Sequence, residues 1–129
     1  RQGVLATLKR DGRPQLSNVI YAVDDEGVVR VSITAERAKY VNLSRDPRAS
    51  LHVARDDFYA YVVLEGDVEL SAVAAAPDDD AVAELVDLYR AMLGEHPDWD
   101  DYRATMVRDR RVVVRLRPTR AYGLLPRPG

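Results

Sequence analysis

Five apolar segments of strand type fill most of the first 71 residues. In the third segment, apolar Val29, Val31 and Ile33 alternate with polar residues, which is the period of a strand with one buried face. Asp11-Gly12, between the first two segments, is a hairpin turn signal. The first half of the chain therefore reads as a β-meander, with strands predicted at Val4–Arg10, Leu16–Val23, Val28–Ile33, Ala49–Ala54 and Tyr59–Ser71.

The hydrophobic period changes in the second half. Apolar residues recur at three- and four-residue spacing from Val82 to Leu93, which is the pattern of a helix with one buried face. We expect Pro77 at the first helical position and Gly94 just beyond the last turn. The other predicted elements are a short helix Glu36–Arg45 with Thr34 as its N-cap, a helix around Trp99–Met106, a strand Arg111–Arg117 and an edge strand Tyr122–Leu125.

This order of elements predicts a mainly β fold, a β-barrel with an α insert, because most strands are neighbours in sequence. A chain of 129 residues has the length of a single domain, so one domain is expected over residues 1–129. The first residue is Arg1, so we expect N-terminal residues of a longer chain to be absent.

The composition excludes several classes of site. The chain has no cysteine and only two histidines, so no disulfide, thiolate metal site or other metal centre is predicted, and we expect a cytoplasmic protein. The longest stretch without a charged residue is Pro14–Val23. It is too short for the ~20 apolar residues that cross a bilayer, so no membrane partner is expected.

The charge is divided unevenly along the sequence. Residues 78–101 hold nine acidic residues and one Arg, a charge of −8, so the rest of the chain must carry +6 to give the net −2. A basic remainder of this kind attracts anionic ligands. No nucleic-acid-binding motif accompanies it, and the pI is 5.7, so no nucleic-acid partner is predicted.

One junction concentrates possible anion ligands. Ser32-Ile33-Thr34 ends a predicted strand, and Arg37 and Lys39 follow at the start of the predicted helix. Free backbone N–H groups at a helix start, an Arg fork and a Lys ammonium can together hold a phosphate. The alternative interpretation is a capped helix with two solvated cations.

A series of short motifs resembles one family over nearly the whole chain, from Gly3 to about Leu125. The sequence is similar to the flavin/deazaflavin oxidoreductase superfamily, whose fold is the FMN-binding-like split β-barrel of pyridoxamine-phosphate-oxidase-like proteins, and above all to its coenzyme F420-binding B group. The motifs are Val4-Leu5-Ala6-Thr7-Leu8, Asp11-Gly12-Arg13-Pro14-Gln15, Arg37-Ala38-Lys39 with Asn42-Leu43, Arg45-Asp46-Pro47-Arg48-Ala49, Leu64-Glu65-Gly66, the Pro77-Asp78-Asp79-Asp80 helix start and Asp109-Arg110-Arg111-Val112.

The resemblance implies a homodimer with a cofactor site in each groove between the subunits. It also implies an F420-dependent oxidoreductase that transfers a hydride from C5 of the deazaflavin ring to an unsaturated small molecule. FMN carries a phosphate as well, so an FMN-binding oxidase or reductase and a non-catalytic F420 carrier remain alternatives.

The same resemblance implies the site residues, although it assigns no catalytic residue. Arg37 and Lys39, with Ala38 between them, would bind the phosphate of the cofactor. The other implied residues are Ser32, Ile33 and Thr34 along the groove, Gln15, Ser17 and Asn18 near the ring, and Tyr59. From the charge division we further expect Arg13, Arg48 or Arg55 to attract the glutamate tail of F420.

Overall fold

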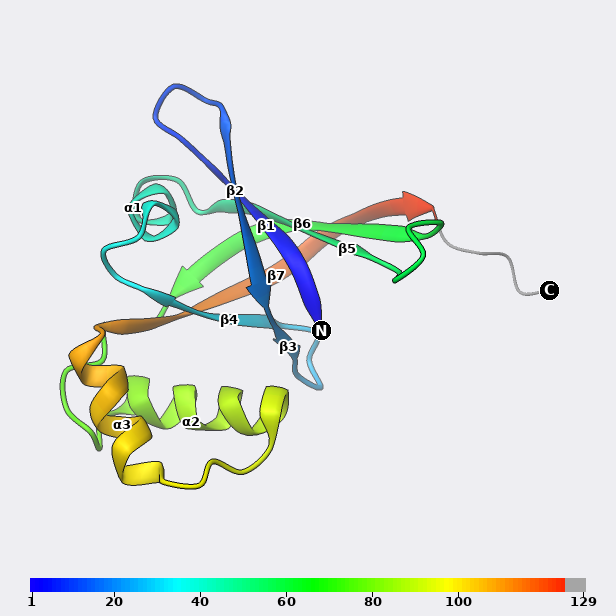
Figure 1. Ribbon diagram of the computed structural model, residues 1–129. Coiled ribbons are helices and arrows are strands. Elements are labelled where there is room, and N and C mark those ends of the chain that lie inside the picture. Colours follow the sequence, from blue (N-terminus) through cyan, green and yellow to red (C-terminus); the bar gives the residue numbers. More distant parts are fainter. Residues whose placement is uncertain (125–129) are drawn as a thin grey trace.

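The computed structural model describes residues 1–124 and contains one seven-stranded antiparallel sheet (Figure 1). The order of strands across the sheet is β2-β1-β5-β6-β7-β4-β3. The strands are β1 (Gln2–Leu8), β2 (Pro14–Ile20), β3 (Ala22–Val23), β4 (Val29–Thr34), β5 (Arg48–Ala54), β6 (Tyr61–Leu70) and β7 (Arg111–Leu124), and the helices are α1 (Ala38–Arg45), α2 (Asp80–Leu93) and α3 (Trp99–Arg108).

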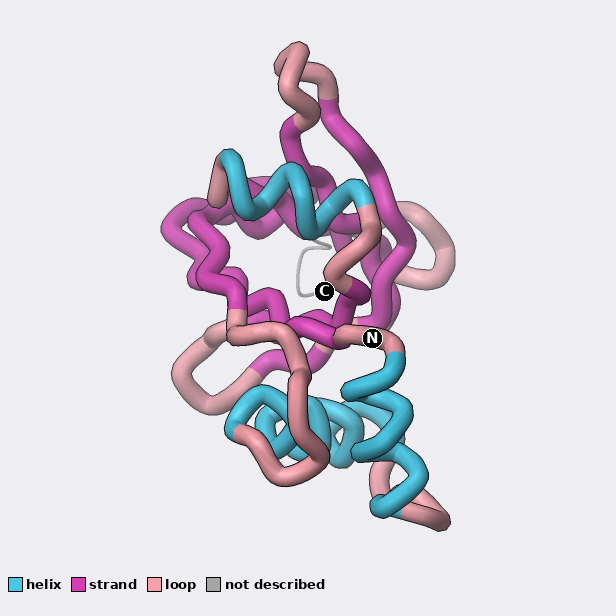
Figure 2. The backbone as a smooth tube through the Cα atoms, turned by 90° about the vertical axis from the view of Figure 1, so that its left-hand side faces the viewer, coloured by secondary structure: helices cyan, strands magenta, loops and turns pink. Residues whose placement is uncertain are grey.

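The sheet is strongly curled, so that its two edges approach each other. Figure 2 shows the strands wrapped around a central space, with α1 across one side and α2 and α3 below. Val19 of one edge strand and Val31 near the other edge belong to the same buried cluster, together with Leu43 of α1. The predicted mainly β fold with a helical insert is therefore confirmed, in the form of a split barrel.

The predicted meander is wrong at the second strand. The segment Leu16–Val23 does not form one strand, because the chain leaves β2 at Tyr21 and β3 pairs with β4 at the opposite edge of the sheet. The predicted strands Arg111–Arg117 and Tyr122–Leu125 are instead one strand, β7, which pairs with β4 and with β6. Leu125 lies outside the described residues.

The helix starts also differ from the prediction. Thr34 is not an N-cap, because it still pairs with Arg111 in the sheet; α1 begins only at Ala38, after Arg37, which makes no side-chain cap. Pro77 precedes α2 by a turn, and Asp79 caps the helix by accepting from the Val82 N–H at 2.8 Å. The end of α2 at Gly94 is confirmed, with φ at 81°.

Two hydrophobic clusters hold the fold together. One fills the barrel and includes Leu5, Ile33, Leu51 and Val114. The second lies between the outer face of the sheet and the helical layer, where Val82, Leu85 and Met106 pack on Val113. None of the helices in the described part of the chain is both long and apolar enough to cross a membrane.

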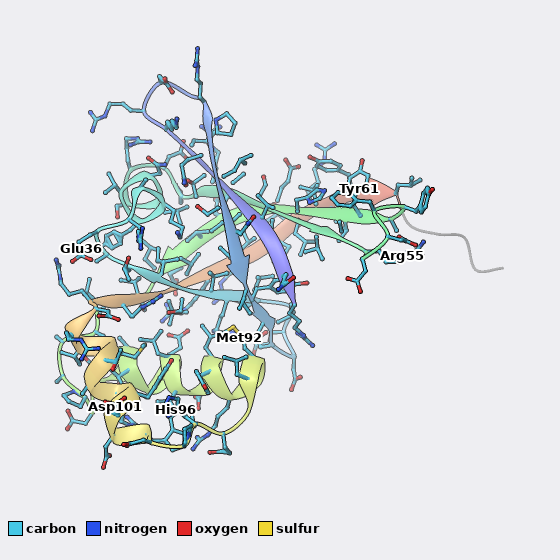
Figure 3. All side chains as sticks on the ribbon, in the orientation of Figure 1. Glu36, Arg55, Tyr61, Met92, His96 and Asp101 are labelled. Atoms are coloured by element: carbon cyan, nitrogen blue, oxygen red, sulfur yellow. The ribbon has the colours of Figure 1, made fainter. Side chains whose placement is uncertain are left out.

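A charged network also holds α2 against the sheet. The Glu84 carboxylate accepts from Arg30 Nε at 2.9 Å and from Arg115 at 2.8 and 2.5 Å. Arg30 also pairs with Asp24, and Arg115 with Glu69. Because α2 is fixed in this way, its last turn reaches the edge of the split barrel, where Met92 lies between the helix and the strands (Figure 3).

Candidate functional site

A groove of about 320 Å³ lies where the two edges of the barrel approach each other. We call it the cation groove. Its walls come from β2, β4, the start of α1, the end of α2 and the first residue of β7. The lining residues are Asn18, Val19, Ile20, Val31, Ser32, Ile33, Thr34, Arg37, Lys39, Met92 and Arg111.

Pairing of β4 with β7 explains why cations gather here. Thr34 lies opposite Arg111 in the ladder, so the outward side chains of the two residues are neighbours. A tight turn follows, in which the Arg37 N–H donates to the Thr34 carbonyl oxygen at 3.2 Å. This turn returns the chain to the end of the strand and brings Arg37 and Lys39 to the same wall as Arg111.

The three cations of the groove have no carboxylate partner among residues 1–124. Arg37, Lys39 and Arg111 are absent from the ion pairs of the described chain. Arg111 makes one long contact, from Nη1 to Ser32 Oγ at 3.5 Å, and its Nε is buried without any partner. A buried N–H that lacks an acceptor is rare in folded proteins. The groove therefore has donors for an anion.

The electrostatic environment of Lys39 also favours an anion in the groove. Burial lowers the pKa of Lys39, and the charges of Arg37 and Arg111 lower it further. Three positive charges thus face one another in a partly desolvated groove, where the repulsion between them is screened less than in water. An anion bound between them would relieve this repulsion.

Most of the site residues expected from the sequence line this groove, some with their side chains and some only with their backbone. Ser32 and Thr34 are half-buried on the outer face of β4, whereas Ile33 is 1% exposed and points into the core, so only its backbone borders the groove. Asn18 is exposed and lines the groove from β2. Ala38 is exposed at the first residue of α1 and is absent from the groove lining.

The structure does not bring the remaining expected residues to the groove. Gln15 and Ser17 lie on the opposite face of β2 from Asn18, because side chains alternate along a strand. Gln15 there accepts from the Thr7 hydroxyl at 3.3 Å and donates to Ser17 Oγ at 3.0 Å. Tyr59 is 78% exposed in the turn between Arg55 and Tyr61, at the opposite end of the barrel from Glu36 (Figure 3).

Five lining residues of the cation groove were not predicted as site residues: Val19, Ile20, Val31, Met92 and Arg111. Arg111 and Met92 come from elements far from β2 and β4 in the sequence. Arg111 stands at the start of a strand, and its neighbour in space, Thr34, lies 77 positions earlier, so only the pairing of the strands identifies it. Met92 has the helical spacing of a core residue. Its position in the groove depends on where α2 packs.

A second, wider groove of about 920 Å³ continues from the first. It shares Asn18, Val19, Ile20 and Met92 with the cation groove and extends along β1 and β5. Its remaining lining includes Val4, Tyr21, His52, Val53, Phe58 and Leu93. A ligand with an anionic group and a large ring system could thus place one part in each groove.

Comparisons with known proteins match nearly the whole chain. The family model of pyridoxamine 5′-phosphate oxidase matches residues 1–125. A conserved hypothetical protein from Mycobacterium tuberculosis, Rv2991, has 28% sequence identity and a TM-score of 0.74, with coverage of 100% of this chain and 83% of that one.

Two further solved structures carry functional names. One named F420 reductase is 31% identical with a TM-score of 0.64, and the match covers 94% of this chain and 88% of that one. A heme binding protein from Mycobacterium smegmatis is 25% identical with a TM-score of 0.67, and the match covers 95% of this chain and 48% of that one.

Proposed function

Since this chain belongs to the pyridoxamine 5′-phosphate oxidase family of split β-barrels, we propose that it is an oxidoreductase that uses coenzyme F420 to reduce an unsaturated small molecule. The observation that carries this proposal is the set of three cations, Arg37, Lys39 and Arg111, that form no ion pair within residues 1–124, where the buried Nε of Arg111 also lacks an acceptor. Such a set fits the phosphodiester of F420. The relative named F420 reductase supports the choice of cofactor.

Each part of the site has a separate role in this proposal. Arg37 and Arg111 would hold phosphate oxygens through their guanidinium forks, and Lys39 would add a compact charge. Ser32 and Thr34 offer hydroxyl donors from the adjoining strand. When bound, reduced F420 supplies a hydride from C5 of its deazaflavin ring. The wider groove would hold the ring and exclude water from the substrate beside it.

Two alternatives share the fold and part of the site. FMN has a phosphate that suits the same cations, and a protein that binds F420 without turnover would need the same groove. Equilibrium titration of the purified protein with F420, FMN and heme, side by side, tests the choice. We expect F420 to bind most tightly. A preference for FMN or heme by tenfold, about 1.4 kcal/mol, would contradict the proposed cofactor.

Turnover is a separate question from binding. Reduced F420 should be oxidised in the presence of at least one member of a panel of enones, quinones and linear tetrapyrroles. Tight binding without oxidation by any of them would identify the protein as a carrier of the cofactor.

We further propose that the chain works as a homodimer with its sites between subunits. Leu16, Tyr122 and Leu124 are 63%, 50% and 61% exposed, and the strand register puts them all on the outer face of the sheet. A second copy would cover this apolar face. Tyr59, which lies far from the cation groove of its own chain, would then border the groove of the neighbouring copy.

A further inference from the structure

His52 lies on the outer face of the sheet and lines the wider groove. Its neighbour Leu51 is 0% exposed and points into the barrel, so the half-buried His52 side chain points outward, because side chains alternate along a strand. In the strand register Val4 of β1 separates His52 from Asn18, a span of about 10 Å at the usual spacing of strands. Asn18 lines both grooves, whereas His52 lines only the wider one.

The imidazole ring of His52 is held in place by stacking and has no hydrogen-bond partner within residues 1–124. It stacks on the ring of Tyr61 in β6, with 5.5 Å between the ring centroids and 22° between the planes. Neither ring nitrogen donates or accepts a hydrogen bond in this part of the chain. Neither nitrogen is buried without a partner either, so both are open to a ligand in the groove.

The other histidine of the sequence has a structural role. His96 Nδ1 accepts from the Asp98 N–H at 2.9 Å, and its ring packs among the rings of Tyr89, Trp99 and Tyr102. His96 lies in the helical layer (Figure 3) and lines neither groove. No set of contacts of this kind within the described residues accounts for His52.

Four other ionisable side chains line the wider groove, and none is as well suited to give up a proton. Arg1 and Arg55 carry guanidinium groups, which do not release protons in proteins. Asp56 is exposed, and a carboxylate accepts hydrogen bonds without donating one. Tyr21 packs against the buried cluster of the barrel. A histidine, by contrast, loses a proton near neutral pH and regains it from water.

Most of the remaining lining of the wider groove is apolar. These residues include Val4, Val19, Ile20, Val53, Phe58 and Leu93. Such a wall favours an apolar body, and one polar group on it would find the imidazole of His52.

We propose that His52 is the proton donor of the reaction, and that its substrate is a largely apolar conjugated carbonyl compound such as an enone. The inference rests on the proposed function, because the hydride comes from reduced F420. The hydride adds to the β-carbon of the enone, where a C–H bond forms, so the substrate is reduced and F420 is oxidised. The electron pair of the C=C bond moves onto the α-carbon and the carbonyl oxygen.

The resulting enolate then takes the proton of the His52 imidazolium. Protonation gives the saturated ketone and leaves a neutral imidazole, which takes a new proton from water. Before the hydride arrives, the same N–H can donate a hydrogen bond to the carbonyl oxygen and so favour the charge that develops there. His52 thus accounts for the proton that the hydride transfer requires.

The experiment compares the reduction of cyclohex-2-enone with that of 2-methyl-1,4-naphthoquinone. Hydride addition to the quinone gives a phenolate, which is a far weaker base than an enolate and needs no acid. H52Q keeps a hydrogen-bond donor but cannot release a proton, so its kcat should fall about 100-fold or more with the enone and by less than about threefold with the quinone. H96Q, the matched control, should reduce both substrates as the wild type does.

Two measurements that do not depend on turnover accompany the kinetics. H52Q should bind F420 within about twofold of the wild type, since His52 lies outside the cation groove. Histidine side-chain NMR of the wild type with oxidised F420, which cannot reduce the enone, should show two ring signals. Addition of cyclohex-2-enone should shift the signal that is missing in H52Q and leave the other unchanged.

The outcomes separate this inference from the proposed function. Unchanged enone reduction in H52Q, equal losses with both substrates, or a His52 signal that does not respond to the enone would overturn the inference alone. Loss of enone reduction in Y21F but not in H52Q would assign the proton to Tyr21 and also overturn it. The same holds if the wild type reduces another member of the panel but no enone. Failure to bind F420, or to oxidise it with any member of the panel, would overturn the proposed function and this inference together.

Discussion

Arg111 and Thr34 lie directly opposite each other in the β4–β7 ladder, and this pairing places a guanidinium with an unpartnered buried Nε at the end of the strand that leads into α1. The cation groove therefore depends on a contact between the two halves of the sequence. Arg37 and Lys39 alone would make an exposed basic turn, whereas Arg111 adds a third cation to the same wall of the groove.

Replacing Arg111 tests this arrangement. In R111A the affinity for F420 and for FMN should both fall by about 1.5–3 kcal/mol, the range for hydrogen bonds to charged groups. The measurement is a binding titration of each ligand. R117A removes an exposed arginine from the same strand, outside the cation groove, and should bind both ligands as the wild type does. Equal affinity of R111A and wild type would exclude Arg111 from the phosphate site.

The charge of Lys39 should lower the stability of the ligand-free protein and strengthen the binding of an anionic ligand. The pKa of Lys39 in the folded protein lies below its ordinary value, because the side chain is partly buried and, to a lesser extent, because Arg37 and Arg111 are nearby. While Lys39 is protonated in both the folded and the unfolded state, its charge therefore lowers the free energy of unfolding. This penalty is fully present at neutral pH and disappears as the pH rises through the folded-state pKa, because the unfolded chain then binds more protons.

We therefore expect K39M to unfold at a higher temperature than the wild type near pH 7, without ligand, and the gap to narrow toward alkaline pH. The affinity of K39M for F420 should fall by about 1.5–3 kcal/mol. Thermal melts at several pH values and a binding titration check both parts. In R37A, which changes an exposed side chain, binding should weaken similarly with little change in melting temperature. A less stable K39M at neutral pH would contradict the argument.

Glu84 should stabilise the fold in a pH-dependent way. Hydrogen bonds from Arg115 first, and from Arg30, lower the pKa of Glu84. The stabilisation is complete above the unfolded-state pKa and is lost as the pH falls through the folded-state value. E84Q should therefore lose roughly 2–3 kcal/mol of unfolding free energy at pH 7, less than a fully buried pair would lose, and should approach the wild type in acid.

Urea unfolding at pH 7 and at successively lower pH measures this effect. D87N, in the same helix and exposed, serves as the control and should change stability by less than about 0.5 kcal/mol. A pH-independent difference between E84Q and the wild type would show that the loss comes from packing and not from the ion pairs.

Assembly is tested by charging the uncovered face of the sheet. The wild type should scatter light as a dimer of 14.5 kDa chains, with an interface of more than about 2,000 Å². L16E introduces a charge on the exposed apolar face and should shift the protein to monomers. V23E, on β3 beside the helical layer, should remain a dimer. A monomeric wild type at micromolar concentration would contradict the proposed assembly.

Local sequence patterns predicted the secondary structure well where neighbours along the chain decide it. The alternation of Val29, Val31 and Ile33 gave β4 within a residue, and the helical spacing from Val82 to Leu93 gave most of α2. Helix starts were less predictable, because a strand that finds a partner extends beyond its local pattern. Thr34 stays in the sheet for that reason and does not cap α1.

Some residues of the candidate site were likewise predictable from local sequence, and others were not. Arg37 and Lys39 were identifiable because a strand end, a turn and a helix start are adjacent in sequence. Which face of the sheet Gln15, Ser17 and Asn18 occupy became clear only when the register of β2 was known. The crossing of the chain from β2 to β3, the position of Met92 and the partner of Arg111 depend on which strands pair and where α2 packs. The sequence by itself thus determined the approximate positions of most strands and helices and the two cations of the turn, because these depend on residues a few positions apart. Only the tertiary structure decided that Arg111 joins them, because contacts between distant segments are set by packing and by strand register.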